Sequence, residues 1–176
     1  MKNAVRLALA LAALALAVPA AAQHEARPAV GLGVSITPND AFLGVNQTIE
    51  LYVPIRIAPQ IRIEPSLGIF SSNGATDRRD FTLGIGGFWV APVAGPVDLY
   101  AGGRLKLNFA HQSTAAASDS STDVSIAAAL GGEYYLVTHF SVGLEGQLGY
   151  YSHGTVNGDD DGLFTTGLAF LRLYFK

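Results

Sequence analysis

The sequence predicts an all-β protein, a closed up-and-down barrel of eight antiparallel strands that crosses a lipid bilayer. Three observations lead to this prediction. Apolar residues alternate with small or polar residues over eight segments, short and long connections alternate between these segments, and the charges within the segments are balanced. Charged residues make up only 14% of the chain, whereas about 25% is usual for a soluble domain.

The first 22 residues have the pattern of a secretory signal peptide, so we expect the barrel to occupy residues 23–176. Lys2 and Arg6 precede an apolar Leu/Ala run, and the alanines at 20–22 fit a cleavage site before Gln23. The run is about a dozen residues long, whereas a spanning helix needs about 20. An uncleaved membrane anchor is therefore the less favoured alternative.

Charge and cysteine content exclude two classes of function. Two of the 11 basic residues lie in the signal segment, which leaves nine against 14 acidic residues, a net charge of −5. An acidic chain of this kind is not expected to bind nucleic acid, which requires a basic face. The chain contains no cysteine, so disulfides and thiol chemistry are absent.

Eight segments show the two-residue period of a strand with one apolar face. In the first segment, for example, Val30, Leu32, Val34 and Ile36 alternate with Gly and Ser. Most of the segments run for about ten residues or more, and a tilted strand needs about 9–11 residues to cross a bilayer. The predicted strands are 30–36, 49–57, 61–69, 81–89, 97–109, 124–136, 140–150 and 165–175.

The connections between these strands are of two kinds. Residues 58–60, 92–96 and 137–139 form short turns, whereas the other connections are longer, polar and rich in Gly, Ser, Asn and Asp. The long connections are 38–47, 71–80, 111–123 and 152–162. Short turns on one side and long loops on the other are typical of outer-membrane barrels.

Ten charged residues lie within the predicted strands, five basic and five acidic. Balance suits an enclosed network, because an unpaired buried charge is costly. We therefore expect Arg104 and Lys106 to point into a lumen and Leu105 to face lipid, where a lysine at mid-bilayer would cost about 2–4 kcal/mol. The candidate lumen residues are Glu50, Arg56, Arg62, Glu64, Asp98, Arg104, Lys106, Glu133, Glu145 and Arg172.

The alternative to a membrane barrel is a soluble β-sandwich with arginine and lysine on its surface. The polar face argues against it, because that face consists largely of Gly, Ser, Thr and Tyr and a solvated face usually carries many Lys and Glu. Aromatic residues gather at the strand ends, as in the two interfacial girdles of a barrel. These residues are Phe70, Phe81, Trp89, Phe109, Tyr134, Phe140, Tyr150, Phe164 and Phe175.

With these features, nearly the whole mature chain resembles the small eight-stranded outer-membrane β-barrels of the OmpA/OmpX type and the opacity-like proteins. Residues 131–151, "GGEYYLVTHFSVGLEGQLGYY", resemble the penultimate hairpin of that family. The end of the chain, "GLAFLRLYFK", resembles its assembly signal, with Leu171, Leu173 and Phe175 at alternate positions. Lys176 after the aromatic residue is a departure, because most members end on the aromatic residue itself.

The resemblance implies a non-enzymatic integral protein of the outer membrane of a Gram-negative bacterium. It implies contact with outer-membrane lipids, lipopolysaccharide and the assembly machinery, and no cofactor. Proteins of this type often act in adhesion or host interaction, but no residue pattern in the chain specifies an extracellular ligand.

A narrow channel for small solutes or ions is one alternative function. An eight-stranded barrel is only wide enough for side chains to fill, so a general diffusion pore is not expected. A passage would require a lumen ion pair, such as Arg104 with Glu133 or Glu145, to exchange partners.

A lipid-modifying enzyme is the other alternative. Some eight-stranded barrels are lipid A deacylases, and "THFSVGLE" resembles them in its His139, Ser141 and Glu145. Activation of a serine requires a base within hydrogen-bond reach, yet His139 falls in a predicted turn on the side away from the outer leaflet. The residue after Ser141 is Val142, whereas the resemblance to that family would require an Asn at this position. We therefore predict no catalytic residue.

No metal site is predicted either. Asn157, Asp159 and Asp161 resemble part of a calcium loop, but such a loop needs a Glu at its twelfth position, where this chain has Leu168. A solvated acidic loop tip is the simpler interpretation.

Overall fold

The structure, a computed structural model, describes residues 29–40, 42–43, 45–73, 76–114 and 117–175. The predicted signal peptide and Lys176 lie outside the described residues. Within these ranges no helix is long and apolar enough to span a bilayer.

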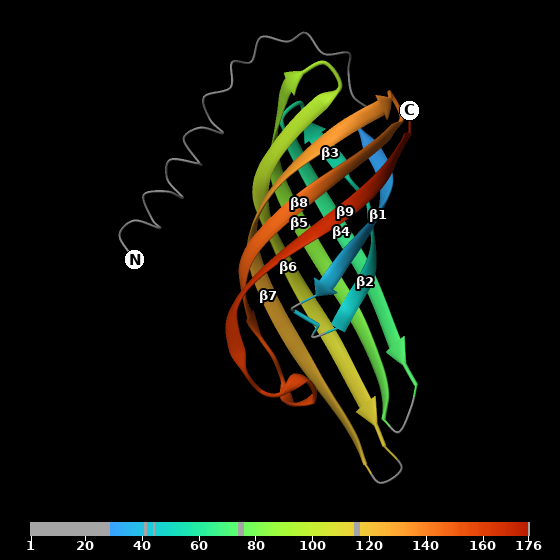
Figure 1. Ribbon diagram of the computed structural model, residues 1–176, viewed down its shortest axis with the longest axis vertical. Coiled ribbons are helices and arrows are strands. Elements are labelled where there is room, and N and C mark those ends of the chain that lie inside the picture. The colour runs from blue at the N-terminus through green and yellow to red at the C-terminus, as the bar shows by residue number, and fades with distance from the viewer. Residues whose placement is uncertain (1–28, 41, 44, 74–75, 115–116, 176) are drawn as a thin grey trace, which may run out of the picture.

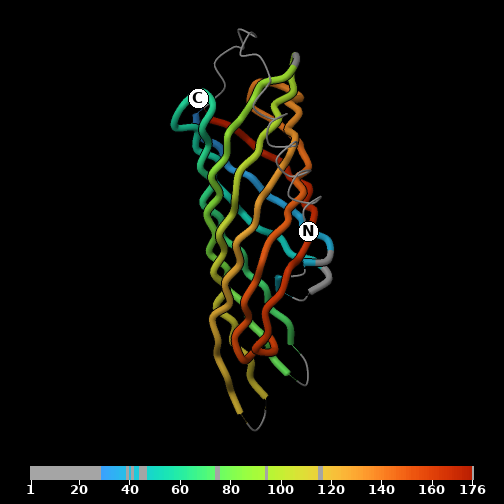
Figure 2. Tube along the Cα trace, turned by 90° about the vertical axis from the view of Figure 1, so that its left-hand side faces the viewer, coloured from blue at the N-terminus to red at the C-terminus, as the bar shows by residue number. Residues whose placement is uncertain are grey.

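The described chain forms one closed antiparallel sheet, so the predicted fold class is confirmed. Neighbouring strands pair in chain order, and the first and last close the barrel through pairs from Val30–Phe175 to Ile36–Ala169. Figures 1 and 2 show the strands winding around a common axis. The elements are β1 (Val30–Asp40), β2 (Val45–Tyr52), β3 (Ile55–Ala58), β4 (Ile61–Ser72), β5 (Asp77–Ala94), β6 (Val97–Ser113), β7 (Ser118–Val137), β8 (Phe140–Ser152), the 3-10 turn η1 (Thr155–Asn157) and β9 (Asp161–Phe175).

The nine strand segments make an eight-stranded barrel because β2 and β3 are two halves of one strand. Both halves pair with β1 on one side and β4 on the other. The interruption lies at Pro54, which has no N–H to donate to the ladder. The Val53 amide still donates to the Pro65 carbonyl at 2.9 Å, and the Pro54 carbonyl accepts from Gly31 at 3.0 Å.

The two ends of the barrel differ. At one end, which we call the turn end, two-residue turns at 59–60, 95–96 and 138–139 join the strands. Gly95 in one of them has a φ of 54°, which favours glycine over other residues. The opposite loop end carries the hairpin tips, which project at the bottom of Figure 1.

The strands at the loop end are longer than the sequence pattern predicts. β5, β6 and β7 continue through residues 77–80, 111–113 and 118–123, which we expected to be loops. Pairs such as His111–Ser120 keep the ladder regular there. Alternation reveals a strand only where one face is apolar, and here both faces are polar.

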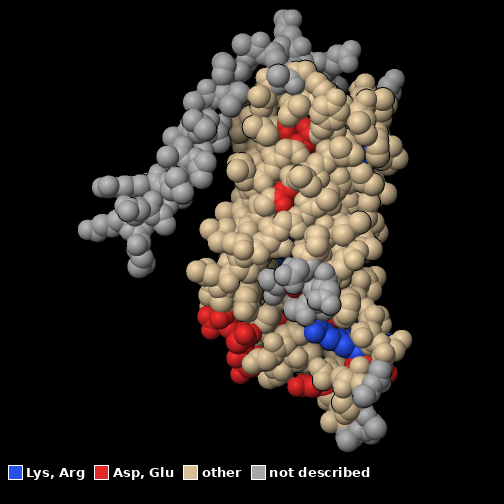
Figure 3. Space-filling view, viewed as in Figure 1, with Lys and Arg blue, Asp and Glu red and all other residues tan. Residues whose placement is uncertain are grey.

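The apolar residues face outward, as the alternation predicts. Leu105 and Leu107 are 42% and 37% exposed, whereas Arg104 and Lys106 are each 7% exposed. Figure 3 shows a largely uncharged barrel wall, with small acidic spots in its upper part and most of the charged surface near the loop end. The prediction is wrong for two expected girdle residues, which occupy inward positions of their strands. Phe164 in β9 is 7% exposed, and Phe70 in β4 is half-buried and follows the inward phase of Glu64 and Ser66.

Glycines on the inner face make room for lumen rings. Tyr52 pairs across the strands with Gly33, and Tyr100 pairs with Gly131. A Cβ added at either glycine would lie 2.3 Å from the paired tyrosine ring, so only glycine lets the ring lie flat across the neighbouring strand. The rings belong to an apolar lining that also includes Phe88 and Phe170.

Candidate functional site

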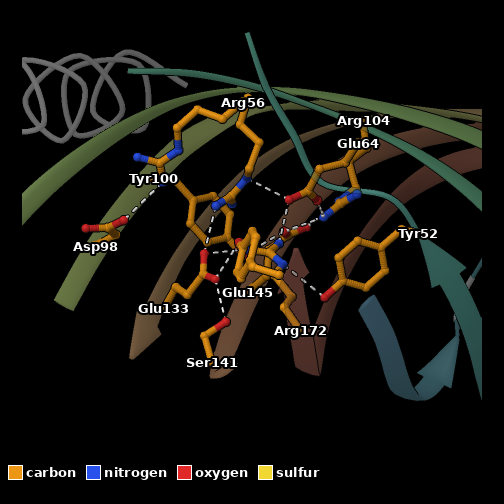
Figure 4. A network of polar contacts seen from close by, with 12 residues as sticks. Tyr52, Arg56, Glu64, Asp98, Tyr100, Arg104, Glu133, Ser141, Glu145 and Arg172 are labelled. Carbon is orange, nitrogen blue, oxygen red and sulfur yellow. Dashed lines mark hydrogen bonds and ion pairs between the residues drawn. The ribbon is translucent and has the colours of Figure 1, made fainter. Parts of the chain in front are cut away.

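The interior of the barrel holds a cluster of six buried charges from five strands. We call Arg62, Glu64, Arg104, Glu133, Glu145 and Arg172 the central cluster (Figure 4). Each residue occupies an inward position of β4, β6, β7, β8 or β9, because successive side chains of a strand point to opposite faces. The alternating pattern therefore sends these side chains towards the same axis.

Four members of the central cluster form a closed ring of alternating charge. Arg62 lies 2.7 Å from Glu64 and 2.7 Å from Glu133. Arg172 lies 2.6 Å from Glu64 and 2.5 Å from Glu133. These side chains are at most 1% exposed, and each charge has two partners of opposite sign, which offsets the cost of removing it from water.

Arg104 links this ring to the third carboxylate. Its Nη2 lies 2.8 Å from Glu64, and its Nε lies 2.7 Å from Glu145. Glu145 also accepts hydrogen bonds from Tyr100 at 2.9 Å and from Gln147 at 2.7 Å. The central cluster is therefore neutral, with three cations and three anions.

Hydroxyl groups complete the hydrogen bonding of Glu133. Ser141 and Tyr174 donate to its Oε1 at 2.6 and 2.7 Å. Tyr52 likewise accepts a hydrogen bond from Arg172 Nε at 3.1 Å. Tyr52 and Tyr174 were not predicted as lumen residues, and Ser141 was considered only as a catalytic candidate, although the inward position of each residue in its strand was the available signal.

Aromatic rings cover the faces of the three guanidinium groups. The Arg172 carbon lies 4.0 Å from the centre of the Phe170 ring, and Arg62 lies 4.6 Å from that of Tyr100. Arg104 lies 4.8 Å from the Phe88 ring. Such contacts favour arginine, whose planar cation can stack and still donate at its edge.

The other four expected lumen residues form two separate ion pairs. Lys106 Nζ lies 2.5 Å from Glu50, and both side chains are less than 10% exposed. Arg56 lies 3.2 Å from Asp98 towards the turn end. All ten residues thus have their side chains inside the barrel, in three groups that are each neutral.

A further polar group near the loop end was not anticipated from the sequence. Asn108 donates to Asp80 at 3.0 Å and to Asp123 at 2.9 Å. Arg78 makes an ion pair with Asp80 at 2.7 Å. Asn108 lies near the end of a predicted strand, whereas Arg78, Asp80 and Asp123 lie in segments that we expected to be loops, and the longer ladder brings these three residues close to Asn108.

The lumen has little free space between these groups. Arg104 and Lys106 line a cavity of about 10 Å³ together with Asp40, Phe42 and Gln147, among others. This volume suits about one water molecule. Beside Arg104 and Lys106, the lumen is therefore filled largely by side chains.

The residues considered for catalysis do not form a nucleophilic pair. The Ser141 hydroxyl is fully buried and donates to Glu133. This carboxylate already pairs with Arg62 and Arg172, whereas the base that activates a serine must be free to accept its proton. His139 lies in the turn, where its carbonyl accepts from the Tyr174 amide at 2.7 Å. Glu145 is occupied by Arg104.

The acidic loop does not gather its side chains around one point. Asn157 donates to Asp123, and Asp161 accepts from Tyr150. Among the described residues, no group of three or more His, Asp or Glu side chains is arranged to hold a metal ion.

The three residues compared with an assembly signal lie on the outer face of β9. Leu171, Leu173 and Phe175 are 47%, 50% and 49% exposed. Because β9 pairs with both β1 and β8, its backbone is engaged on both sides, and the side chains remain accessible from outside the barrel.

Comparisons with known proteins agree with this architecture. The family model of the outer membrane protein beta-barrel domain matches residues 8–170. No curated protein is similar enough to count as a match.

Three solved structures are similar in fold. Neisserial surface protein A has 20% sequence identity, a TM-score of 0.57, and coverage of 83% of this chain and 96% of that one. Ail, the attachment invasion locus protein of Yersinia pestis, in complex with the heparin analogue sucrose octasulfate, has 12% identity, a TM-score of 0.58, and coverage of 86% and 99%. The N-terminal β-barrel domain of Pseudomonas aeruginosa OprF has 10% identity, a TM-score of 0.55, and coverage of 84% and 99%.

Proposed function

The chain belongs to the outer membrane protein beta-barrel domain family, and we propose that it is a structural and surface-interaction protein of the Gram-negative outer membrane rather than a pore or an enzyme. The observation that carries this proposal is the neutral, hydrogen-bonded central cluster, which fills the lumen at mid-barrel. A barrel that is closed inside leaves its two ends and its lipid-facing wall for contacts with other molecules.

The proposal separates this chain from the two alternatives. A narrow channel would require the central cluster to open. Opening is opposed because each carboxylate of the cluster has at least two hydrogen-bond or ion-pair partners among arginine, tyrosine, serine and glutamine side chains. A lipid-modifying activity lacks support because the Ser141 hydroxyl is fully buried and bonded to Glu133, which two arginines already neutralise. The family is defined by its barrel domain and not by a reaction.

The charge of the loop end indicates which charge a binding partner at this surface should carry. Among the described residues of the loop end, five carboxylates are exposed, against the exposed Arg79 and the half-buried Arg78, which leaves a net charge of −3. The five are those of Asp77, Asp119, Asp159, Asp160 and Asp161. Ail was solved with a sulfated heparin analogue, but an acidic surface repels such an anion. Electrostatic complementarity therefore favours a partner with positive charge, and this attraction will weaken with salt.

Two measurements test the proposal. In planar bilayers, the folded protein is expected to give no discrete conductance steps, whereas regular steps from folded monomer would favour the narrow channel. Vesicles that contain the protein are expected to bind polylysine more than heparin, with protein-free vesicles as the control. Preferential heparin binding would contradict the proposed charge complementarity.

Export and assembly complete the proposal. We propose that residues 1–22 are removed on export, which leaves 23–176 as the mature barrel. We also propose that Leu171, Leu173 and Phe175 contact the outer-membrane assembly machinery, and that lipids and lipopolysaccharide surround the wall. Mass spectrometry of the protein from outer membranes tests the cleavage, and a slower appearance of folded Phe175→Ala barrel in membranes tests the signal.

A further inference from the structure

A small polar cavity lies at the loop end, between the β6–β7 hairpin and the 3-10 turn η1. Its volume is about 210 Å³, and Figure 1 shows β6 and β7 reaching the lower end of the barrel. Gln112 and Asp119, which pair across the two strands, line it from the hairpin, and Thr155 and Val156 line it from η1. No residue of the central cluster lines this cavity, so it is separate from the charged site in the lumen.

Hydrogen bonds within the protein hold η1 against the hairpin. The Thr155 hydroxyl donates to Asp119 Oδ2 at 3.1 Å. Just before η1, the Gly154 amide donates to Asp123 at 2.8 Å, and this carboxylate is fully buried in β7. The walls of the cavity are therefore fixed by the protein's own bonds, and a site that is fixed in advance has a smaller ordering cost on binding.

Asp119 gives the cavity one negative charge. Its carboxylate is exposed, and among the described residues its two oxygens accept only from uncharged donors, the Thr155 hydroxyl and the Ser120 amide at 2.8 Å. An ionised carboxylate has about four acceptor positions, so about two of them remain. None of the described residues that line the cavity is basic, and the charge of Asp119 is therefore available to a cation from another molecule.

The uncharged lining residues complete a site for an alkylammonium group. The Gln112 amide and the Ser118 hydroxyl provide further acceptors, and Val156 provides an apolar surface. A lysine ammonium has three rotatable donors at the end of a flexible methylene stem, and such a stem packs on apolar surface while its head remains in a polar environment. Arginine fits less well because its planar fork pairs best with two free carboxylate oxygens, and each Asp119 oxygen already accepts one hydrogen bond.

We propose that this cavity, which we call the lysine pocket, receives a lysine side chain of a protein partner, with the ammonium on Asp119 and the stem against Val156. This inference rests on the proposed function, in which the acidic loop end attracts a cationic partner. It adds the position of the contact and the chemical group that makes it. Of the five exposed carboxylates described at the loop end, Asp119 is the one that lines the lysine pocket.

Two substitutions that remove the same charge test the lysine pocket in vesicles that contain the folded protein. Asp119→Asn is expected to weaken polylysine binding at low salt at least about threefold, as the loss of a well-placed exposed ion pair would. Asp159→Asn is the matched control, because it removes another exposed carboxylate at a φ of 53° that asparagine tolerates. It should weaken binding less than about 1.5-fold. Equal weakening by both variants overturns the lysine pocket and leaves the proposed function intact, because net charge alone would then attract polylysine.

Nuclear magnetic resonance of the folded protein in lipid nanodiscs locates the contact independently of polylysine. Nα-acetyl-lysine methylamide should shift the amide signals of Asp119 and Val156 in a saturable way, whereas the norleucine analogue, which has no ammonium, should not. Shifts that both probes cause, or a lysine response that Asp119→Asn keeps, would overturn the lysine pocket. Tighter binding of spermidine would overturn the assignment to a protein partner, because one carboxylate lines the cavity and further ammonium groups gain little there. If the lysine shifts appear but polylysine binds no better than heparin, the lysine pocket stands and the proposed function fails.

Discussion

Replacement of Arg172 by methionine tests whether the central cluster stabilises the barrel. Arg172 is fully buried and bridges Glu64 and Glu133, so the variant removes one cation and leaves the lumen with a net negative charge. Loss of one partner from a buried pair typically costs about 3–5 kcal/mol. Both carboxylates keep Arg62, and we therefore expect a loss of unfolding free energy of about 3 kcal/mol, at the lower end of that range.

A second substitution distinguishes lost pairing from lost packing. In the double variant Arg172→Met with Glu133→Gln, the lumen is neutral again, and at least about half of the loss is expected to return because close partners couple by about 0.5–3 kcal/mol. Arg56→Met is the matched control. Arg56 has one ion pair at 3.2 Å and an 11% exposed side chain, so its loss should be smaller.

Urea titration of the protein in phospholipid vesicles measures these changes. Trp89 is the single tryptophan and is 45% exposed on the outer face, so its fluorescence reports whether the wall contacts lipid. Heat-modifiable migration in gels gives an independent measure of the folded fraction. If the loss of unfolding free energy in the double variant equals the sum of the losses in the two single variants within about 0.5 kcal/mol, the coupling that we infer from the ring of charges is refuted.

Two further substitutions test the assignment of faces. Leu105→Lys should destabilise the barrel in vesicles by about 2–4 kcal/mol. The double variant Lys106→Leu with Glu50→Leu should lie within about 1 kcal/mol of the wild type because it removes a whole buried pair, whereas Lys106→Leu alone leaves Glu50 unpaired and is less informative. Similar losses for Leu105→Lys and the double variant would contradict the assignment of faces. Gly131→Ala should lower the unfolding free energy by about 1–3 kcal/mol because the added methyl group clashes with a tyrosine ring. The control is Gly146→Ala, whose added Cβ meets no atom within 4 Å and which should be neutral in the same urea titration. Equal effects would argue against the close approach at Gly131.

The direction of each strand side chain could be predicted from the sequence. Alternation is a local property: an apolar side chain and its two neighbours in the strand necessarily point to opposite faces. Leu105 and Lys106 could therefore be assigned to opposite sides of the wall before any partner was known. The confirmed barrel follows from the same alternation, because eight such strands in lipid must close to satisfy their backbone groups.

The partners of the lumen charges could not be predicted in this way. Arg104 was expected to meet Glu133 or Glu145, and in the structure it contacts Glu145 and Glu64. Which side chains meet across the axis depends on the tilt and stagger of the closed barrel, and these are properties of the whole sheet. The same holds for the hydroxyl of Ser141, which reaches Glu133 only because their strands are adjacent.

The loop end shows most clearly the difference between what the sequence predicts and what it does not. Nothing in the alternation indicates that β5–β7 extend through polar residues, or that His153 reaches the Phe42 carbonyl 111 positions away in the chain. The sequence alone determined which face of each strand is apolar, because that is decided residue by residue by the solvent it prefers. Only the tertiary structure decided which polar groups meet, because those distances are set by barrel closure and not by neighbours in the chain.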